Sequence, residues 1–275
     1  MGVIYHYCSP EAFLSIAKNK KLWLSATNNM NDFFEGTWLS KALENVLSCN
    51  QTSDNKPMRE EISRQFNVNN NIKYITCFSK KSDILSQWRA YAQNGEGVAI
   101  GFDEDVLGLD SGMALNHPDP KCSIKLNSVK YMSGNELSDM LINVLKESGI
   151  ELLPEKEKLS SGMLMDLGTR LSYLSSVVKN SAFIEEQEKR IIYSPLIFGD
   201  GKDNSTKIFN PIGDMHYRIS NGFLTSYFEF EFKSESVVEV VCGPKNKFSQ
   251  YDIETFMGLN GLGLARTHRS AATYR

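Results

Sequence analysis

Two carboxylates and a guanidinium alternate at Glu186, Glu188 and Arg190. The apolar run at 191–193 favours a strand, in which alternate side chains lie on one face. On that face the two carboxylates and the arginine would influence one another's protonation. On a helix, Glu186 and Arg190 would instead form an ordinary surface pair. We therefore predict a strand over 183–193 with all three charged side chains on one face.

A second polar group, Asn31, Asp32 and Glu35, lies in the run ATNNMNDFFE at 26–35. The side chains of Asn and Asp compete with helical backbone hydrogen bonds, so this run predicts a loop. In one interpretation Asp32 caps the following helix and Glu35 completes a capping box. In the other, the loop lies at the mouth of a pocket and presents a carboxylate and an amide to a ligand. The sequence leaves both interpretations open.

Local signatures of most enzyme classes are missing from the sequence. Its four histidines and five cysteines include no close pair with metal-ligand spacing, so we expect no metal site built on such a motif. It contains no P-loop, no G-x-G-x-x-G after a strand and no G-x-S-x-G. Scattered cysteines, odd in number, predict reduced thiols in a cytoplasm.

Composition limits the classes of partner. The 275 residues include 30 basic and 33 acidic side chains, a net charge of −3, so no generic nucleic-acid binding is expected. No apolar run reaches membrane-spanning length, and no secretory leader is evident, so we expect a cytoplasmic protein without a membrane partner.

The elements that must position the polar residues form two units of strand, helix and strand. In the first, a strand at 3–7 carries His6 and Tyr7, a helix begins at Ser9, and a second strand ends at Ser25. In the second, strands at 72–78 and 98–102 flank a short helix that carries Trp88 and Tyr91 at helical spacing. We expect Trp88 and Tyr91 to form the floor of a pocket.

The remaining chain alternates amphipathic helices with β-rich segments near its end. The pattern predicts an α+β fold with a mixed, largely antiparallel sheet and packed helices. We expect a single domain over 1–275, with irregular insertions near 104–122 and 198–214 that are rich in Gly, Asp, Pro and Asn.

Several short motifs together resemble one bacterial family, the domain of unknown function 2971. They keep their order along nearly the whole chain, although Phe33 stands where the family more often has proline. The family name implies no chemistry. The motifs are Tyr5-x-Tyr7, Leu22-Trp23-x-Ser25, Asn31-Asp32-x-x-Glu35, Cys77-Phe78-Ser79, Trp88-x-x-Tyr91-Ala92, Gly97, Phe102-Asp103, Glu186-x-Glu188-x-Arg190, Gly243-Pro244 and Ser270-x-x-x-Tyr274-Arg275.

A more distant resemblance is to ADP-ribosyltransferases, which use NAD as a substrate. It implies that His6 holds the NAD ribose and that Ser25 lines the pocket. Glu188 would be the catalytic carboxylate that stabilises an oxocarbenium-like charge, and Glu186 would orient the acceptor. Arg190 fits this scheme less well, because it would compete for the charge unless it binds a phosphate.

Three functions follow as hypotheses. The first is an NAD-using ADP-ribosyltransferase or NAD glycohydrolase, acting as a bacterial toxin or phage-defence effector on an unknown acceptor. Its nucleotide site would include the residues His6, Tyr7, Ser25, Asn31, Asp32, Glu35, Trp88, Tyr91 and Arg190. The second is a phosphodiesterase or nuclease whose Asp32, Glu35, Glu186 and Glu188 gather a divalent cation. The third is a non-catalytic ligand sensor or protein-interaction domain with a pocket of Trp23, Trp88 and Tyr91. The first hypothesis predicts that the 31–35 loop and the helix of Trp88 approach one cavity.

Overall fold

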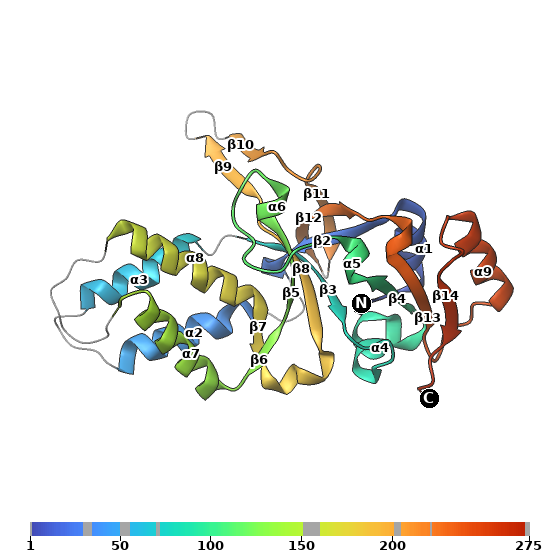
Figure 1. Cartoon of the computed structure of the whole chain (residues 1–275), viewed down its shortest axis with the longest axis horizontal. Helices are drawn as coiled ribbons and strands as arrows, with labels where there is room; N and C mark the ends of the chain where they lie inside the picture. Colours follow the sequence, from blue (N-terminus) through green and yellow to red (C-terminus); the bar gives the residue numbers. More distant parts are fainter. Residues whose placement is uncertain are drawn as a thin grey trace.

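The structure is a computed structural model that describes residues 2–29, 35–49, 56–69, 72–150, 160–200, 205–220 and 222–272. Ten strands of this part form one mixed, mostly antiparallel sheet, which confirms the predicted α+β class (Figure 1). The main path across the sheet is β11 (His216–Ser220), β12 (Phe223–Glu231), β2 (Lys21–Ala26), β3 (Tyr74–Ser79), β1 (Val3–Cys8), β4 (Val98–Asp103), β13 (Val237–Cys242) and β14 (Arg266–Arg269). Strand β8 (Glu188–Tyr193) branches from β3 and pairs with β5 (Ile124–Ser128).

Helices cover the sheet in two groups, and each group has its own core. Helices α1 (Pro10–Asn19) and α9 (Gln250–Leu259) pack on one core, whereas α2 (Glu35–Cys49), α3 (Lys56–Asn69), α7 (Gly134–Glu147) and α8 (Ser161–Val177) form a bundle around the other (Figure 1). Because side chains alternate along a strand, β3 serves both cores: Tyr74 and Phe78 enter the first and Ile75 the second. Within the described part of the chain, no helix is both long and apolar enough to cross a membrane.

Both predicted units of strand, helix and strand are present. In the first, the Ser9 hydroxyl accepts a hydrogen bond from the backbone N–H of Ala12 at 3.2 Å, and Pro10 begins α1. In the second, α4 (Leu85–Tyr91) connects β3 to β4. Strand β1 lies between β3 and β4, so the two units share one sheet. Short 3-10 helices are η1 (Thr27–Asn29), η2 (Gln93–Gly95), η3 (Ser181–Glu186) and η4 (Ser234–Ser236).

The predicted insertions differ in their regularity. Apart from α5 (Glu104–Leu107) and α6 (Pro120–Ser123), the segment 104–122 is irregular, as expected. The segment 198–214 is not, because β9 (Leu196–Asp200) and β10 (Ser205–Phe209) form an antiparallel ribbon. A separate parallel pair joins β6 (Lys130–Met132) with β7 (Val178–Asn180).

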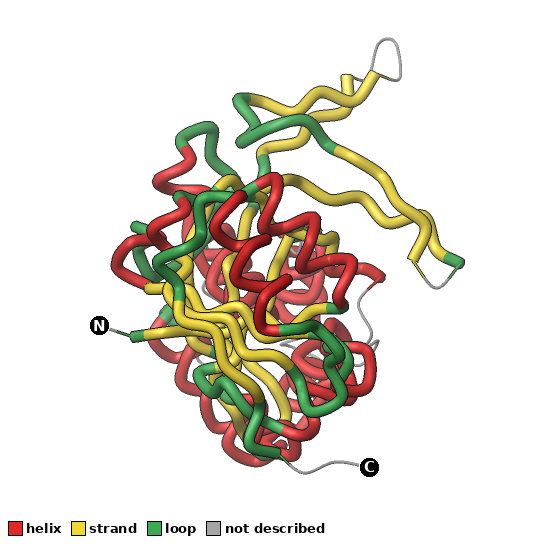
Figure 2. The backbone as a smooth tube through the Cα atoms, turned by 90° about the vertical axis from the view of Figure 1, so that its right-hand side faces the viewer, coloured by secondary structure: helices red, strands yellow, loops and turns green. Residues whose placement is uncertain are grey.

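The hairpin of β11 and β12 extends beyond the main sheet. Strand β12 pairs with β2 only along Tyr227–Glu231, and its remaining residues pair with β11. Figure 2 shows this hairpin and the ribbon of β9 and β10 projecting from the body of the molecule. One face of β11 and β12 therefore continues the surface of β2 outward.

Gly97 lies where three backbone segments meet, and its lack of a side chain is required there. The Gly97 N–H donates to the Ala92 carbonyl at 2.9 Å, and the Gly97 carbonyl accepts from Gly243 at 3.0 Å. An added Cβ at Gly97 would lie 2.0 Å from the Cys8 carbonyl oxygen. Backbone atoms cannot move aside as a flexible side chain can.

Gly97→Ala is therefore expected to lower the free energy of unfolding by about 1–3 kcal/mol, the range for overpacking. Urea denaturation measures the change. Gly134→Ala is the matched control, because an added Cβ at Gly134 meets no atom within 4 Å. Equal stability of the two variants would contradict the close approach of the Cys8 carbonyl oxygen to Gly97.

Candidate functional site

A cavity opens where β1 and β2 separate along one edge of β3. Strand β2 pairs with Tyr74 and Ile75, whereas β1 pairs with Ser79. Between these contacts lies a cavity of about 330 Å³, bordered by Thr76 and Cys77 of β3. Side chains from α1, β1, β2, β11 and β12 complete its wall. The interruption of strand pairing thus creates the opening.

The structure brings two predicted site residues, His6 and Ser25, to this cavity. His6 Nδ1 lies 3.0 Å from the Cys77 carbonyl oxygen, so Nδ1 carries the proton and Nε2 is left as an acceptor. Burial lowers the pKa of His6 below its usual 6.5, and the Cys77 carbonyl only partly offsets this effect. The ring packs edge-on against Phe78, with centroids 5.7 Å apart. At neutral pH His6 is thus an uncharged hydrogen-bonding group.

Strand register places Arg218, Thr225 and Ser25 on one face of the sheet, whereas His6, which packs on Phe78, lies on the other. Ser25 is opposite both Ile75 and Tyr227, and Arg218 is opposite Thr225, two residues before Tyr227. Cross-strand partners point to the same side, and so do residues two apart on a strand. Arg218, Thr225, Ser25 and Ile75 therefore share a face that runs from β11 to β3.

Arg218 is held in place by neutral groups. Its Nη2 donates to the Ser25 hydroxyl at 3.0 Å, and its guanidinium lies 5.1 Å from the Trp23 ring centroid. The buried Nε has no hydrogen-bond partner. An unpaired buried N–H is unfavourable by about 1–3 kcal/mol. Burial also lowers the pKa of Arg218, which nevertheless stays charged at neutral pH.

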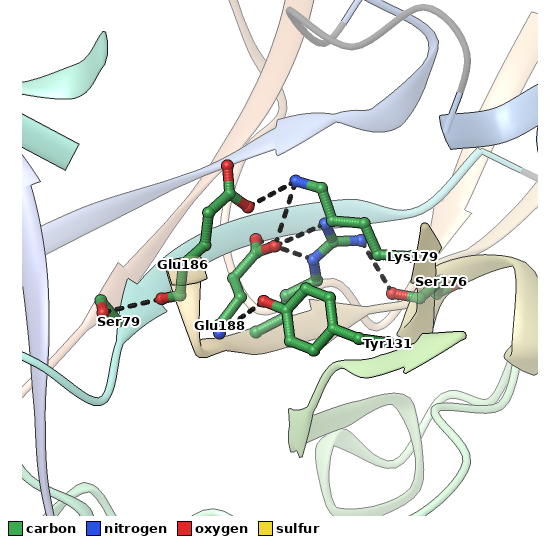
Figure 3. Close-up of polar contacts among 7 residues, drawn as sticks. Ser79, Tyr131, Ser176, Lys179, Glu186 and Glu188 are labelled. Atoms are coloured by element: carbon green, nitrogen blue, oxygen red, sulfur yellow. Dashed lines mark hydrogen bonds and ion pairs between the residues drawn. The ribbon is translucent and has the colours of Figure 1, made fainter. Parts of the chain in front are cut away.

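Four charged side chains, those of Lys179, Glu186, Glu188 and Arg190, form a compact cluster (Figure 3). Arg190 donates from Nε and Nη2 to the two Glu188 oxygens at 2.9 and 2.8 Å, and from Nη1 to the Ser176 carbonyl at 3.0 Å. Lys179 Nζ lies 2.7 Å from Glu186 Oε2 and 3.5 Å from Glu188 Oε2. Two cations thus balance two carboxylates in a largely buried site.

The prediction that Glu186 shares a strand face with Glu188 and Arg190 is wrong. Strand β8 begins at Glu188, and Glu186 is the last residue of η3. Gln187 takes the left-handed conformation, with φ of 44°, and ends the 3-10 turn before the strand starts. Glu188 and Arg190 do share a face, as predicted. Glu186 is instead linked to this pair by Lys179, which forms ion pairs with both Glu186 and Glu188.

Cys77 connects the charged cluster to the cavity. Its side chain borders the cavity, and it is opposite Arg190 in the pairing of β3 with β8. Burial alone would raise the pKa of Glu188, but Arg190, Lys179 and a hydrogen bond from Cys77 lower it below the usual value. The Glu188 carboxylate therefore stays ionised directly behind one wall of the cavity.

Tyr7 and Trp88 have packing roles in the structure. The Tyr7 hydroxyl donates to the Lys81 carbonyl at 2.9 Å and accepts from the Ile84 N–H at 3.0 Å. Trp88 is fully buried, with its ring centroid 4.7 Å from that of Tyr7, and its Nε1 donates to Asp83 at 2.6 Å. Both residues fix α4 rather than line the cavity. Their predicted contact with a nucleotide stays a prediction.

Tyr91, on the same helix, faces the charged cluster. Its ring is 42% exposed, and burial around the hydroxyl, together with the charge of Glu186, raises the pKa of Tyr91. Tyr131 approaches the cluster from β6, and its hydroxyl accepts a hydrogen bond from the Glu188 N–H at 2.8 Å. Two tyrosine hydroxyls therefore lie near the carboxylates. Of the two aromatic residues of α4, Tyr91 lies near the charged cluster, whereas Trp88 is buried.

Asn31 and Asp32 lie outside the described residues, and Glu35 is described only as the first residue of α2. Their predicted approach to the cavity stays a prediction, as does the capping interpretation. Among the described residues, no group of three or more His, Cys, Asp or Glu side chains could hold a metal ion. The cation-binding set proposed from sequence included Asp32, so it is not tested by this finding.

Sequence reasoning missed Lys179, Cys77 and Arg218 as members of the site. Lys179 comes directly after the apolar helical pattern of α8 (Ser161–Val177). The strand that carries it, β7, is only three residues long, so no strand pattern is recognisable there. In the sequence, Cys77 stands out only as part of the motif Cys77-Phe78-Ser79, which assigns it no role. Arg218 lies in the alternating run HYRIS at 216–220, and this period of two was the available signal for a strand with one polar face.

Comparison with known proteins finds a family model that is similar to part of the chain. No curated protein matches it, and no solved structure matches it, so the resemblance to ADP-ribosyltransferases gains no support. The segment 87–191 matches a family model and contains Trp88, Tyr91, Lys179, Glu188 and Arg190. The matched family model is described as protein of unknown function (DUF2971).

Proposed function

We propose that the protein binds an NAD-type nucleotide in the cavity between β1 and β2 and cleaves its bond between ribose and nicotinamide. The observation that carries this proposal is that His6 and Ser25 line one cavity. Cys77, which is also in the wall of this cavity, is hydrogen-bonded to Glu188. These residues come from three strands and converge without being close in sequence. The cavity volume lies within the range of small-molecule sites.

The reaction requires stabilisation of positive charge on the ribose. The C1′–N bond breaks and nicotinamide leaves with the electron pair, so the ribose carbon becomes cationic. An ionised carboxylate fixed beside that carbon stabilises the charge electrostatically. Glu188 is suited to this role, because Arg190 and Lys179 keep it ionised and in one orientation. His6 would position the ribose by hydrogen bonding.

Glu186 has a different environment, which fits the second role expected from sequence. Its side chain is 13% exposed, against 8% for Glu188, and its Oε2 lies 2.7 Å from Lys179 Nζ. A carboxylate of this kind can orient an acceptor and take its proton as the new bond to C1′ forms. The acceptor is either water, which makes the enzyme a glycohydrolase, or a nucleophile on another molecule.

The biological setting we propose is a bacterial cytoplasm, where the enzyme would act as a toxin or phage-defence effector by consuming or transferring from NAD. The five cysteines are all free thiols, which suits a reducing compartment.

Purified protein incubated with NAD is expected to release nicotinamide, and NAD is expected to raise the melting temperature. Chromatography of free nicotinamide and differential scanning fluorimetry measure the two effects. Mg²⁺ and Mn²⁺ are tested separately. Stabilisation by a divalent metal alone, with cleavage of nucleic acid and no nicotinamide release, would replace this proposal with phosphodiester chemistry. Binding of NAD without turnover would instead indicate a ligand sensor.

A further inference from the structure

We infer that Arg218 binds the phosphate groups of a nucleoside diphosphate moiety in this cavity. The inference rests on the proposed nucleotide site and adds the element that recognises the anion. It concerns a residue of the projecting hairpin, on a different strand from the carboxylate Glu188.

Charge around the cavity favours an anionic ligand. Among the described residues that line it, none is Asp or Glu, whereas Lys21 and Arg218 are cations. Lys21 is already neutralised, because its Nζ lies 2.7 Å from Glu229. Arg218 forms no ion pair with any carboxylate of the described chain. It is therefore the cation of this wall whose charge remains to be balanced.

The guanidinium is also oriented before any ligand arrives. Ser25 holds Nη2 from one side, and Trp23 supports the guanidinium plane. Trp23 itself packs against Tyr227, with ring centroids 4.5 Å apart. A guanidinium held in this way can donate two parallel hydrogen bonds to a phosphate.

Hydroxyl groups near Arg218 suit a phosphorylated sugar better than a simple carboxylate. Ser25 and Thr225 line the cavity on the same face as Arg218, and Ser220 lies two residues further along β11. These neutral donors can bond phosphate oxygens or ribose hydroxyls. His6 lies on the opposite side of the gap, on β1, so a ligand that contacts both residues spans the opening between the strands.

The test compares ADP, inorganic pyrophosphate and adenosine by isothermal titration calorimetry without added divalent metal. Wild-type protein is expected to bind ADP at least about 10-fold more tightly than adenosine. Arg218→Gln should weaken ADP binding by about 10–100-fold, the range for losing a charge-assisted pair, and leave adenosine binding unchanged. Arg218→Lys should recover only part of the affinity, because a lysine lacks the two-pronged geometry.

Arg266→Gln is the matched control, since Arg266 is exposed on β14, at the other end of the strand path from β11. Its ADP affinity should equal that of wild type. Equal binding of ADP and adenosine, or an unchanged ADP affinity in Arg218→Gln, would overturn the inference. Both results are independent of nicotinamide release, so a failure here is distinguishable from a failure of the proposed reaction. Melting curves confirm that each variant is folded.

Discussion

Replacing Arg190 by methionine is expected to lower the free energy of unfolding by about 3–5 kcal/mol, the range for removing one partner of a buried ion pair. Arg190 is buried, and both oxygens of Glu188 accept hydrogen bonds from it. A methionine side chain is similar in length to that of arginine, but it cannot donate hydrogen bonds to Glu188. The carboxylate then keeps Lys179 as a cationic neighbour, with its Nζ 3.5 Å away. Urea denaturation at neutral pH measures the loss.

Dependence on pH separates this charge effect from a packing defect. Because the folded pKa of Glu188 is lowered, the stability it contributes is complete above its usual pKa of 4.5 and is lost as pH falls through the folded value. The deficit of Arg190→Met should therefore shrink below about pH 4, where a protonated Glu188 needs no partner. A deficit that stays constant with pH would indicate lost packing alone.

Arg170→Met provides the control for the stability measurement. Arg170 pairs with Asp166 and Glu147 on the exposed surface of α8 and α7. Such exposed pairs contribute below about 1 kcal/mol. A similar loss in both arginine variants would contradict the central role of the buried cluster.

Glu188→Gln is expected to reduce nicotinamide release by about 10²–10³-fold, the range for deleting one preorganised electrostatic group. Glutamine keeps the shape and can still accept a hydrogen bond from Arg190, but it removes the negative charge. NAD binding should survive, because the carboxylate acts on the cationic ribose and not on the bound ground state. Initial rates of nicotinamide release and NAD titrations give the two quantities.

Two further variants are compared with Glu188→Gln. Glu185→Gln changes the same residue type three positions away at an exposed site, and its activity should be that of wild type. His6→Ala should weaken NAD binding as well as turnover, since His6 is proposed to contact the ribose. If Glu188→Gln retains full activity while folded, Glu188 is a structural ion and the catalytic assignment is wrong.

Much of the fold was predictable because local patterns and tertiary structure agree. The alternation in β3, the Ser9–Pro10 start of α1 and the glycine-bearing turn after α4 each specify their element without distant contacts. The segment 183–193 is the counterexample. Its apolar end predicts a strand, but the left-handed Gln187 separates Glu186 from it, and no propensity rule requires that conformation at a glutamine.

The site was only partly predictable, since its members meet through pairing that no local pattern encodes. Sequence spacing found Glu188 with Arg190, because two residues on one strand need no tertiary knowledge. It could not place Cys77 against Glu188, which depends on the register of β3 with β8. Arg218 likewise reaches Ser25 only through the order of β11, β12 and β2.

The cavity between β1 and β2 is built from residues far apart in the sequence, and this determines when it can form during synthesis. His6 and Cys77 are 71 residues apart in the chain, and Ser25 and Arg218 are 193 apart. Such distant partners can pair only after the intervening chain has been made. A ribosome that has not yet released residue 218 therefore carries a nascent chain whose cavity lacks Arg218. If the proposed NAD cleavage is correct, this long-range assembly would keep unfinished chains inactive in the cell that produces them.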